Sequence, residues 1–335
     1  MLKLMNRKVL YSMQAVVLLV IAMYTAAGGV SQKEIIFPEL AALAVGAWVL
    51  GNQRWLSRPL LICISPTLAA VTGTIIVHFL SQYQVVAILL AFVLVSIELW
   101  IMRSQVTPSI SAAILPIFLQ IDSLYYPIAV GVLTAIIALP RLSLLSYQKR
   151  LGASQKEPFA VKVESAATQA EQGTSAYGGG RLGEDKKCLK WLGIFAGVSL
   201  ITLIAFITNW KFIVAPPLIV TFVEIIQHRS GMSGQRFKLV LLVGCASIWG
   251  TLSMIVLHNM VHLPLAVVAG SSVIGVLILF KALKLSFPPA MAIALLPTII
   301  SSEDLLLYSV QVVTGAFLFI ILSRFYKTNS HFPSV

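Results

Sequence analysis

The sequence predicts an all-α membrane protein with many membrane segments, and three observations lead to this fold class. Hydrophobic residues make up 58% and charged residues 11% of the 335-residue chain, whereas a soluble domain is about 25% charged. Twelve apolar segments recur at or near the length needed to cross a bilayer. All but two of the 24 Lys and Arg residues fall on one side when the twelve segments are drawn as crossings. Because positively charged loops stay in the cytoplasm, we expect cytoplasmic termini and a bacterial plasma membrane.

The twelve segments form two groups of six around a polar stretch. The first group covers roughly residues 9–30, 35–50, 59–80, 84–102, 107–121 and 124–141. The second covers roughly residues 190–209, 212–227, 237–258, 265–283, 287–302 and 305–323. The first segment is longer than the apolar region of a signal peptide, so we expect a membrane helix there. The stretch at residues 143–187 is rich in Lys, Glu, Gln, Ser and Gly, which predicts a flexible cytoplasmic linker.

The two groups match each other, which predicts an internal duplication. Pro108–Tyr126 and Pro289–Leu307 share Pro, Ala, Leu, Pro, an acidic residue and Leu at the same six positions. Other matched positions are Gly73 with Gly250, Thr74 with Thr251, Arg58 with Arg236, and Arg103 with Lys284. We therefore expect one membrane repeat at residues 1–142 and a second at residues 188–335. Each repeat would hold four full helices and two short segments, and its two three-segment units would point in opposite directions, as in 3+3 inverted repeats.

The short segments of each repeat begin with proline and are the best candidates for a binding site. Proline suits the first helical turn because it donates no hydrogen bond, and the residue before it favours extended backbone. Such a break lies at membrane depth only inside protein or beside a cavity, where the free N–H groups and positive partial charge of a helix start would attract an anion. The predicted substrate-binding residues are Pro38, Glu39, Thr107, Pro108, Ser109, Ser111, Pro216, Pro217, Thr221, Pro288 and Pro289. The alternative is that these are short, proline-capped spans in a thinned bilayer.

Charged residues near these segments form a second candidate set. Four matched basic residues would ring a cytoplasmic mouth and attract an anion, while membrane orientation alone is the alternative explanation for them. A carboxylate within an apolar segment, as at Glu39, Glu98 and Glu224, is expected to serve transport or proton coupling. Gating or electrostatic roles are therefore predicted for Arg58, Arg103, Glu224, Arg236 and Lys284.

The sequence contains no recognisable catalytic or metal-binding constellation. We expect no enzymatic activity, no catalytic residues, no metal and no cofactor. The net charge of +12 is explained by short loops beside membrane segments and by contact with anionic lipid headgroups. It does not indicate nucleic-acid binding.

Residues 285–296, Leu-Ser-Phe-Pro-Pro-Ala-Met-Ala-Ile-Ala-Leu-Leu, resemble the His-Pro-Pro-Ala-Gly-Ala-Thr-Ala-Leu-Leu run of the HPP family of membrane proteins. Gly234-Gln235-Arg236 is similar to that family's Gln-Pro-Arg stretch, and residues 214–218 take the place of its small-residue segment. The family is usually drawn with four helices, and its plant plastid members are linked to nitrite transport, so the resemblance implies a small inorganic anion. Phe287 stands where the family has histidine, and Thr107-Pro108 replaces Pro-Pro in the first repeat.

These patterns lead to one main functional hypothesis and several alternatives. We expect a secondary transporter or channel-like carrier for a small solute, most simply a small anion or carboxylate, with a midplane site between the short helices. Export of an amphiphilic compound fits the same pattern. The second class is a non-transporting scaffold or sensor subunit that docks a partner through residues 143–187, and a lipid-modifying enzyme is the third. The expected partners are a small-molecule solute and membrane lipid, with a monomer or homodimer as the oligomeric state.

Overall fold

A computed structural model describes residues 2–154, 182–227 and 235–328. Within these ranges the chain is helical and contains no strand, which confirms the predicted all-α class. The long helices are α1 (Leu2–Val30), α4 (Leu60–Leu80), α5 (Gln84–Ile101), α7 (Tyr125–Ser154), α9 (Leu182–Ile207), α12 (Arg236–Ser253), α13 (Leu265–Leu283) and α15 (Leu305–Thr328). The short helices are α2 (Glu39–Ala44), α3 (Gln53–Leu56), α6 (Pro108–Leu119), α10 (Pro216–Gln227) and α14 (Pro289–Leu295). Single-turn or π-helical pieces are η1 (Lys33–Ile35), η2 (Val45–Val49), η3 (Lys211–Val214), η4 (Met254–Met260) and η5 (Leu296–Thr298).

Seven helices in the described part of the chain are long and apolar enough to cross a bilayer, as expected of an integral membrane protein. Their apolar spans are Val9–Val30, Leu60–Leu80, Gln84–Ile101, Tyr125–Ser146, Arg236–Met260, Leu265–Leu283 and Leu305–Arg324. Four more apolar helices are shorter, namely Pro108–Leu119, Trp191–Ile207, Pro216–Ile226 and Pro289–Thr298. Eleven of the twelve segments expected from the sequence therefore correspond to a full span or to a shorter apolar helix, while the segment at 35–50 is divided among η1, α2 and η2.

The short helices start at the prolines that the sequence singled out. Pro38 and Pro288 precede the first residues of α2 and α14, while α6 and α10 begin at Pro108 and Pro216. A helix of 12 residues, such as α6 or α10, rises about 18 Å, against about 30 Å of hydrocarbon. Neither helix crosses a bilayer alone, so the chain beside it must cover the remaining depth within the protein.

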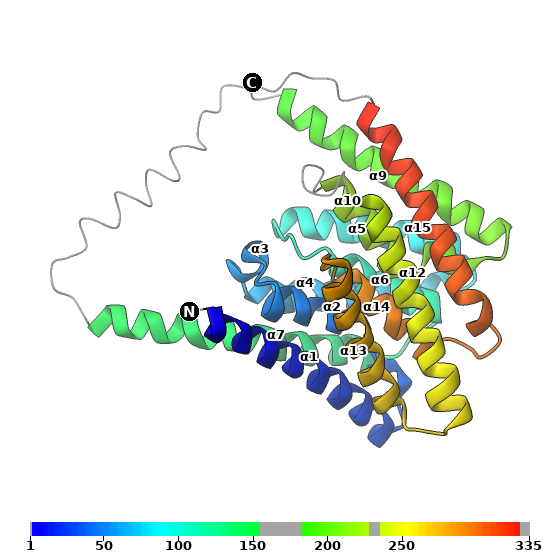
Figure 1. Ribbon diagram of the computed structural model, residues 1–335. Coiled ribbons are helices and arrows are strands. Elements are labelled where there is room, and N and C mark those ends of the chain that lie inside the picture. Colours follow the sequence, from blue (N-terminus) through cyan, green and yellow to red (C-terminus); the bar gives the residue numbers. More distant parts are fainter. Residues whose placement is uncertain (1, 155–181, 228–234, 329–335) are drawn as a thin grey trace.

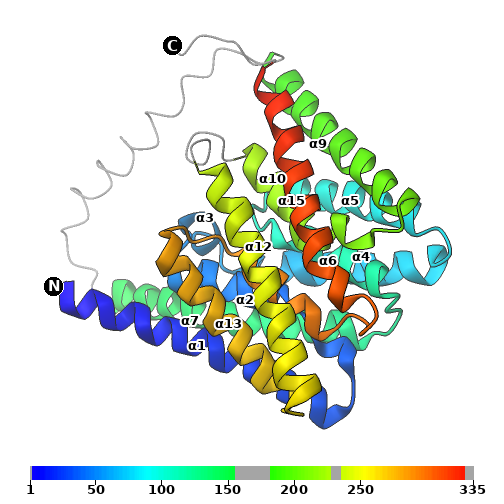
Figure 2. The same cartoon turned by 45° about the vertical axis from the view of Figure 1, so that its right-hand side comes forward.

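The short helices α2, α6 and α14 lie near the centre of the molecule, between the long ones (Figures 1 and 2). α2 contacts α14 and α6, while α10 contacts α6 and α14. Long helices from distant parts of the sequence also meet, because α1 packs against α13 and α9 packs against α5. The two parts of the chain on either side of residues 155–181 are therefore interlocked and share one buried core.

Two glycines allow long helices to press against the backbone of short ones. A Cβ on Gly73 of α4 would overlap the carbonyl oxygen of Ala113 in α6. A Cβ on Gly250 of α12 would overlap the carbonyl oxygen of Ala294 in α14. Only glycine permits such a close approach. Both glycines belong to the pairs that the sequence comparison matched.

Helix ends also repeat between the two parts of the chain. Arg103 follows α5 and Lys284 follows α13, and both adopt left-handed backbone with φ of 49° and 51°. In both places the N–H of the next residue donates to the carbonyl oxygen five positions earlier. The distances are 2.8 Å from Ser104 N to Leu99 O and 3.2 Å from Leu285 N to Phe280 O. Ser31 and Asn209, with φ of 57° and 56°, follow α1 and α9 in a second matched pair.

The polar linker expected at residues 143–187 is partly helical. α7 continues beyond its apolar span to Ser154, and α9 already begins at Leu182. Residues 155–181, which include three consecutive glycines at 178–180, lie outside the described residues.

Candidate functional site

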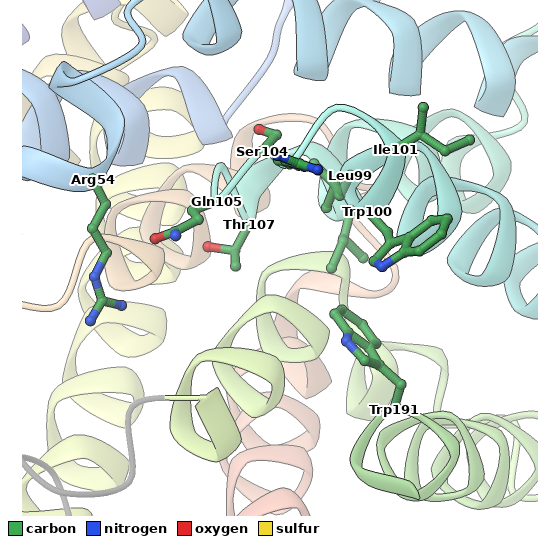
Figure 3. Close-up of a pocket in the computed structure, with 10 residues that line it drawn as sticks. Arg54, Leu99, Trp100, Ile101, Ser104, Gln105, Thr107 and Trp191 are labelled. Carbon is green, nitrogen blue, oxygen red and sulfur yellow. The ribbon is translucent and has the colours of Figure 1, made fainter. Parts of the chain in front are cut away.

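A cavity of about 1000 Å³ opens beside the start of α6. Arg54 lies on one side of it and the indole rings of Trp100 and Trp191 on the other, with Gln105 and Thr107 between them (Figure 3). The lining also includes Leu99, Ile101, Arg103, Ser104 and Ile110. Its walls therefore combine cationic, hydroxyl, amide and aromatic groups, which suits a small polar solute.

A second cavity of about 260 Å³ shares Arg54, Arg103 and Gln105 with the first and adds Arg58. We call the two together the arginine vestibule. Trp55 holds the backbone of the lining residue Gln105 in place, because the Trp55 indole Nε1 donates to the Gln105 carbonyl oxygen at 2.9 Å. The side chain of Trp55 in turn fills the space beside Gly46.

The vestibule is positively charged. Arg54, Arg58 and Arg103 are all solvent-exposed and line it together. Neither Arg58 nor Arg103 is paired with a carboxylate among the residues that the structure describes. Three cations that share one concave wall concentrate anions there, and low-dielectric walls strengthen the attraction.

The inner end of the vestibule is the N-terminus of α6. Thr107 precedes Pro108, lines the vestibule and is buried. Its Oγ1 donates to the Glu224 Oε1 of α10 at 2.7 Å. The carboxylate of Glu224 thus stands at the positive end of the α6 dipole. Two residues predicted to have functional roles, more than a hundred positions apart, meet here.

The helix starts do not offer the free N–H groups expected from the sequence. In α6, the Ser109 and Ile110 N–H groups donate to the carbonyl oxygens of Val106 and Thr107, each at 3.1 Å. The same three-residue turns close the first N–H groups of α2, α10 and α14. The expectation of open donors is therefore wrong for these groups, since tight first turns satisfy them. What remains for an anion is the arginines, because the hydroxyl of Thr107 and the positive end of α6 already face Glu224.

A second polar cluster is buried where α2 meets α6. Ser111 donates its hydroxyl proton to Glu39 Oε1, and the other carboxyl oxygen of Glu39 has no partner. Glu39 is 2% exposed. Ser109 on α6 is fully buried, and its hydroxyl is also without a partner. The structure thus brings together Glu39, Ser109 and Ser111, three of the predicted substrate-binding residues, on two short helices.

Other predicted residues have local roles. The Thr221 hydroxyl donates to the Pro217 carbonyl oxygen at 2.8 Å, so it serves its own helix. Pro38, Pro108, Pro216, Pro217 and Pro289 are buried, and Pro288 is half-buried. Arg236 and Lys284 do not line the arginine vestibule, so the ring of four basic residues expected from the sequence is not assembled there. Only Arg58 and Arg103 of that set share the vestibule.

Sequence reasoning missed several lining residues. Arg54 lies four positions before Arg58, and this basic pair beside a short helix was an available signal. Trp100, Gln105 and Trp191 carried no signal, because their approach depends on how α5 packs against α9. In the described residues, no group of three His, Cys, Asp or Glu side chains is placed to hold a metal ion.

Comparison with known proteins gives no relative for this chain. No family model, no curated protein and no solved structure matches it.

Proposed function

We propose that this chain is a secondary transporter or channel-like carrier for a small anion or carboxylate, built from two homologous halves in one polypeptide. The arginine vestibule is its cytoplasmic mouth, since Arg54, Arg58 and Arg103 belong to the side that carries nearly all the positive charge. The solute would be held by these arginines, close to the start of α6 where Thr107 bonds Glu224. Both termini are then cytoplasmic.

The duplication is supported by local geometry at matched positions. Gly73 and Gly250 lie against the carbonyl oxygens of Ala113 and Ala294. Arg103 and Lys284 share the same left-handed backbone at the same helix end. Matched sequence and matched backbone at independent places are what tandem halves produce. Transporters that are built from internal repeats place their substrate site between the repeats, near the midplane of the bilayer.

One observation carries the functional proposal: an anion-attracting vestibule leads to the end of a short, broken membrane segment. The cavity runs from Arg103 to Thr107, and α6 is too short to span a bilayer by itself. Short helices that begin within the protein are a common way to build transport sites. The resemblance of Leu285–Leu296 to the HPP family favours the same solute class.

Anion binding can be tested with the full-length protein purified in detergent. We expect nitrite, nitrate, formate or acetate to raise the unfolding temperature saturably, because a ligand that binds only the folded state stabilises it. Sucrose and choline chloride serve as neutral and cationic controls. Exchange of the same anion across proteoliposomes, with protein-free vesicles subtracted, then tests transport.

The matched lysine provides the control variant. Arg103→Gln should weaken the anion-induced shift and the exchange rate about tenfold or more, since it removes a vestibule cation. Lys284→Gln alters the matched helix end, which has the same backbone conformation but lies outside the vestibule, and should leave both unchanged. Equal losses in the two variants, or no anion-induced shift in the wild type, would refute the proposal.

A further inference from the structure

Glu39 is a buried carboxyl group without a compensating cation. It stands in the first turn of α2 and is 2% exposed. Ser111 donates to one of its oxygens, while the other has no partner. No Lys, Arg or His among the described residues pairs with it. An ionised carboxylate in such surroundings is very costly, so this burial favours the neutral acid.

Three tyrosines on other helices lie within electrostatic range of Glu39. α2 packs against α1, α6, α7, α14 and η2. The titratable groups that interact electrostatically with Glu39 are the phenols of Tyr24 on α1, Tyr126 on α7 and Tyr308 on α15. α6, α14 and η2 contribute no titratable side chain.

The three phenol protons are already committed. Tyr126 donates to the Ala112 carbonyl oxygen at 2.9 Å, and Tyr308 donates to the Ile293 carbonyl oxygen at 2.6 Å. Tyr24 bonds to Thr298, whose own proton goes to the Leu295 carbonyl oxygen at 2.6 Å. None of these hydroxyl groups donates to Glu39, so Glu39 itself is the group in this cluster that can gain or lose a proton.

The Glu39 cluster is connected to the arginine vestibule by one turn of α6. Thr107 faces the vestibule and bonds Glu224, and Ser111, four residues later, bonds Glu39. This spacing corresponds to about 6 Å along the helix and places both hydroxyls on one face. Any shift of α6 that follows solute binding at Thr107 therefore also moves the hydrogen-bond donor of Glu39.

We propose that Glu39 is the proton-binding site that couples solute movement to a proton gradient. When α2 and α6 are closed, the buried carboxyl holds its proton. When solute binding shifts α6 and water reaches the cluster, the proton leaves to that water and the carboxylate is solvated until the helices close again. The proton enters from water on one side and leaves to water on the other, so one carboxyl carries one proton for each cycle.

The coupling is expected to use a single site in each chain. The position matched to Glu39 is Pro217, and the position matched to Ser111 is Ala292. Neither can hold or bind a proton. The Glu39 site therefore binds one proton in each chain and has no counterpart in the second half, although the polypeptide is duplicated. This inference rests on the proposed transport function, which supplies the solute-driven movement.

The test uses proteoliposomes of the full-length protein with a pH-sensitive dye trapped inside. Nitrate, nitrite, formate and acetate gradients are imposed in turn, with protein-free vesicles subtracted because the weak acids cross lipid unaided. Wild-type protein should show proton movement that accompanies anion movement. Glu39→Gln, which keeps the shape of the carboxylic acid without a transferable proton, should lose at least nine-tenths of the proton movement for each anion moved.

Glu98→Gln is the matched control. Glu98 also accepts from a hydroxyl, that of Thr72, but it is half-exposed and lies on α5, outside the central cluster. It should leave proton movement unchanged. If Glu39→Gln does not fold, Ser111→Ala decides, because loss of the donor should move the pH midpoint of proton-coupled exchange.

The outcomes separate the two proposals. Absence of anion movement in the wild type overturns the transport function itself. Anion movement without proton movement in the wild type, or proton movement that persists in Glu39→Gln, leaves transport standing and overturns the role of Glu39. An unchanged pH midpoint in Ser111→Ala counts against Glu39 in the same way.

Discussion

Substituting alanine at Gly73 should destabilise the protein, and the sign follows from two opposing effects. Alanine in place of glycine inside a helix is favourable by about 1 kcal/mol. The added Cβ, however, would overlap the Ala113 carbonyl oxygen. A backbone oxygen cannot rotate away as a side chain can, so α4 and α6 must separate, which places the cost near the top of the range of about 1–3 kcal/mol for overpacking. The expected net loss for Gly73→Ala is about 2 kcal/mol.

Other glycines supply graded controls for the same substitution. Gly250→Ala should match Gly73→Ala, because its Cβ would meet the Ala294 carbonyl oxygen in the same way. Gly270→Ala should cost less, since its nearest neighbours are the flexible side-chain carbons of Ile21 at 3.1 Å. Gly28 has no atom within 4 Å of a Cβ, so Gly28→Ala should be neutral or stabilising by up to about 1 kcal/mol.

Thermal unfolding in one detergent at one scan rate ranks these variants, with intrinsic tryptophan fluorescence as the signal. A spread of about 3 kcal/mol between Gly28→Ala and Gly73→Ala corresponds to roughly 4 °C, taking about 2.1 cal/mol/K for each of the 335 residues. Because unfolding of such proteins is often irreversible, the order of the midpoints is the decisive result. If Gly73→Ala unfolds at or above the midpoint of Gly28→Ala, the close approach of α4 and α6 is wrong.

Three further predictions test separate contacts. Tyr126→Phe and Tyr308→Phe should each lower stability by about 1–2 kcal/mol, because each leaves a buried carbonyl oxygen unbonded. Thermal midpoints check this by comparison with Tyr125→Phe, a control whose side chain is exposed. Gln311→Leu should cost about 1–3 kcal/mol, since the buried Phe212 N–H donates to the Gln311 side chain at 2.9 Å, and a midpoint equal to wild type would contradict it. Raising the concentration of an untransported salt should slow anion exchange, and less so in Arg58→Gln, because salt screens the vestibule charges. If the initial exchange rate falls equally steeply with salt in the wild type and in Arg58→Gln, that result would count against electrostatic attraction.

The sequence predicted local features well and long-range ones poorly. The prolines at 108 and 289 mark helix starts because their effect on the backbone is local. Matched glycines at 73 and 250 proved to be matched contacts, since the same backbone approach requires the same missing Cβ. The approach of Tyr308 to Glu39 was not predictable, because it depends on packing between segments that lie more than two hundred positions apart in the sequence.

The helix starts also show that the sequence predicts position better than hydrogen bonding. Proline predicted where α6 begins but not that its first N–H groups would be closed by tight turns, because that depends on the conformation of Val106 and Thr107. Likewise, Arg103 and Lys284 look equivalent in sequence and share backbone geometry, yet only Arg103 lines the vestibule. What differs is the neighbouring chain, which the sequence pattern does not reveal.

The interlocking of the two parts of the chain has a consequence for biosynthesis. Thr107 and the centre of α6 leave the ribosome well before Glu224 and α10, which cover them in the finished fold. Until those residues are synthesised, the polar face of α6 can pack only against Glu39 and the helices that precede it in the sequence. The N-terminal part of the chain therefore stays incompletely packed until the second part has been synthesised.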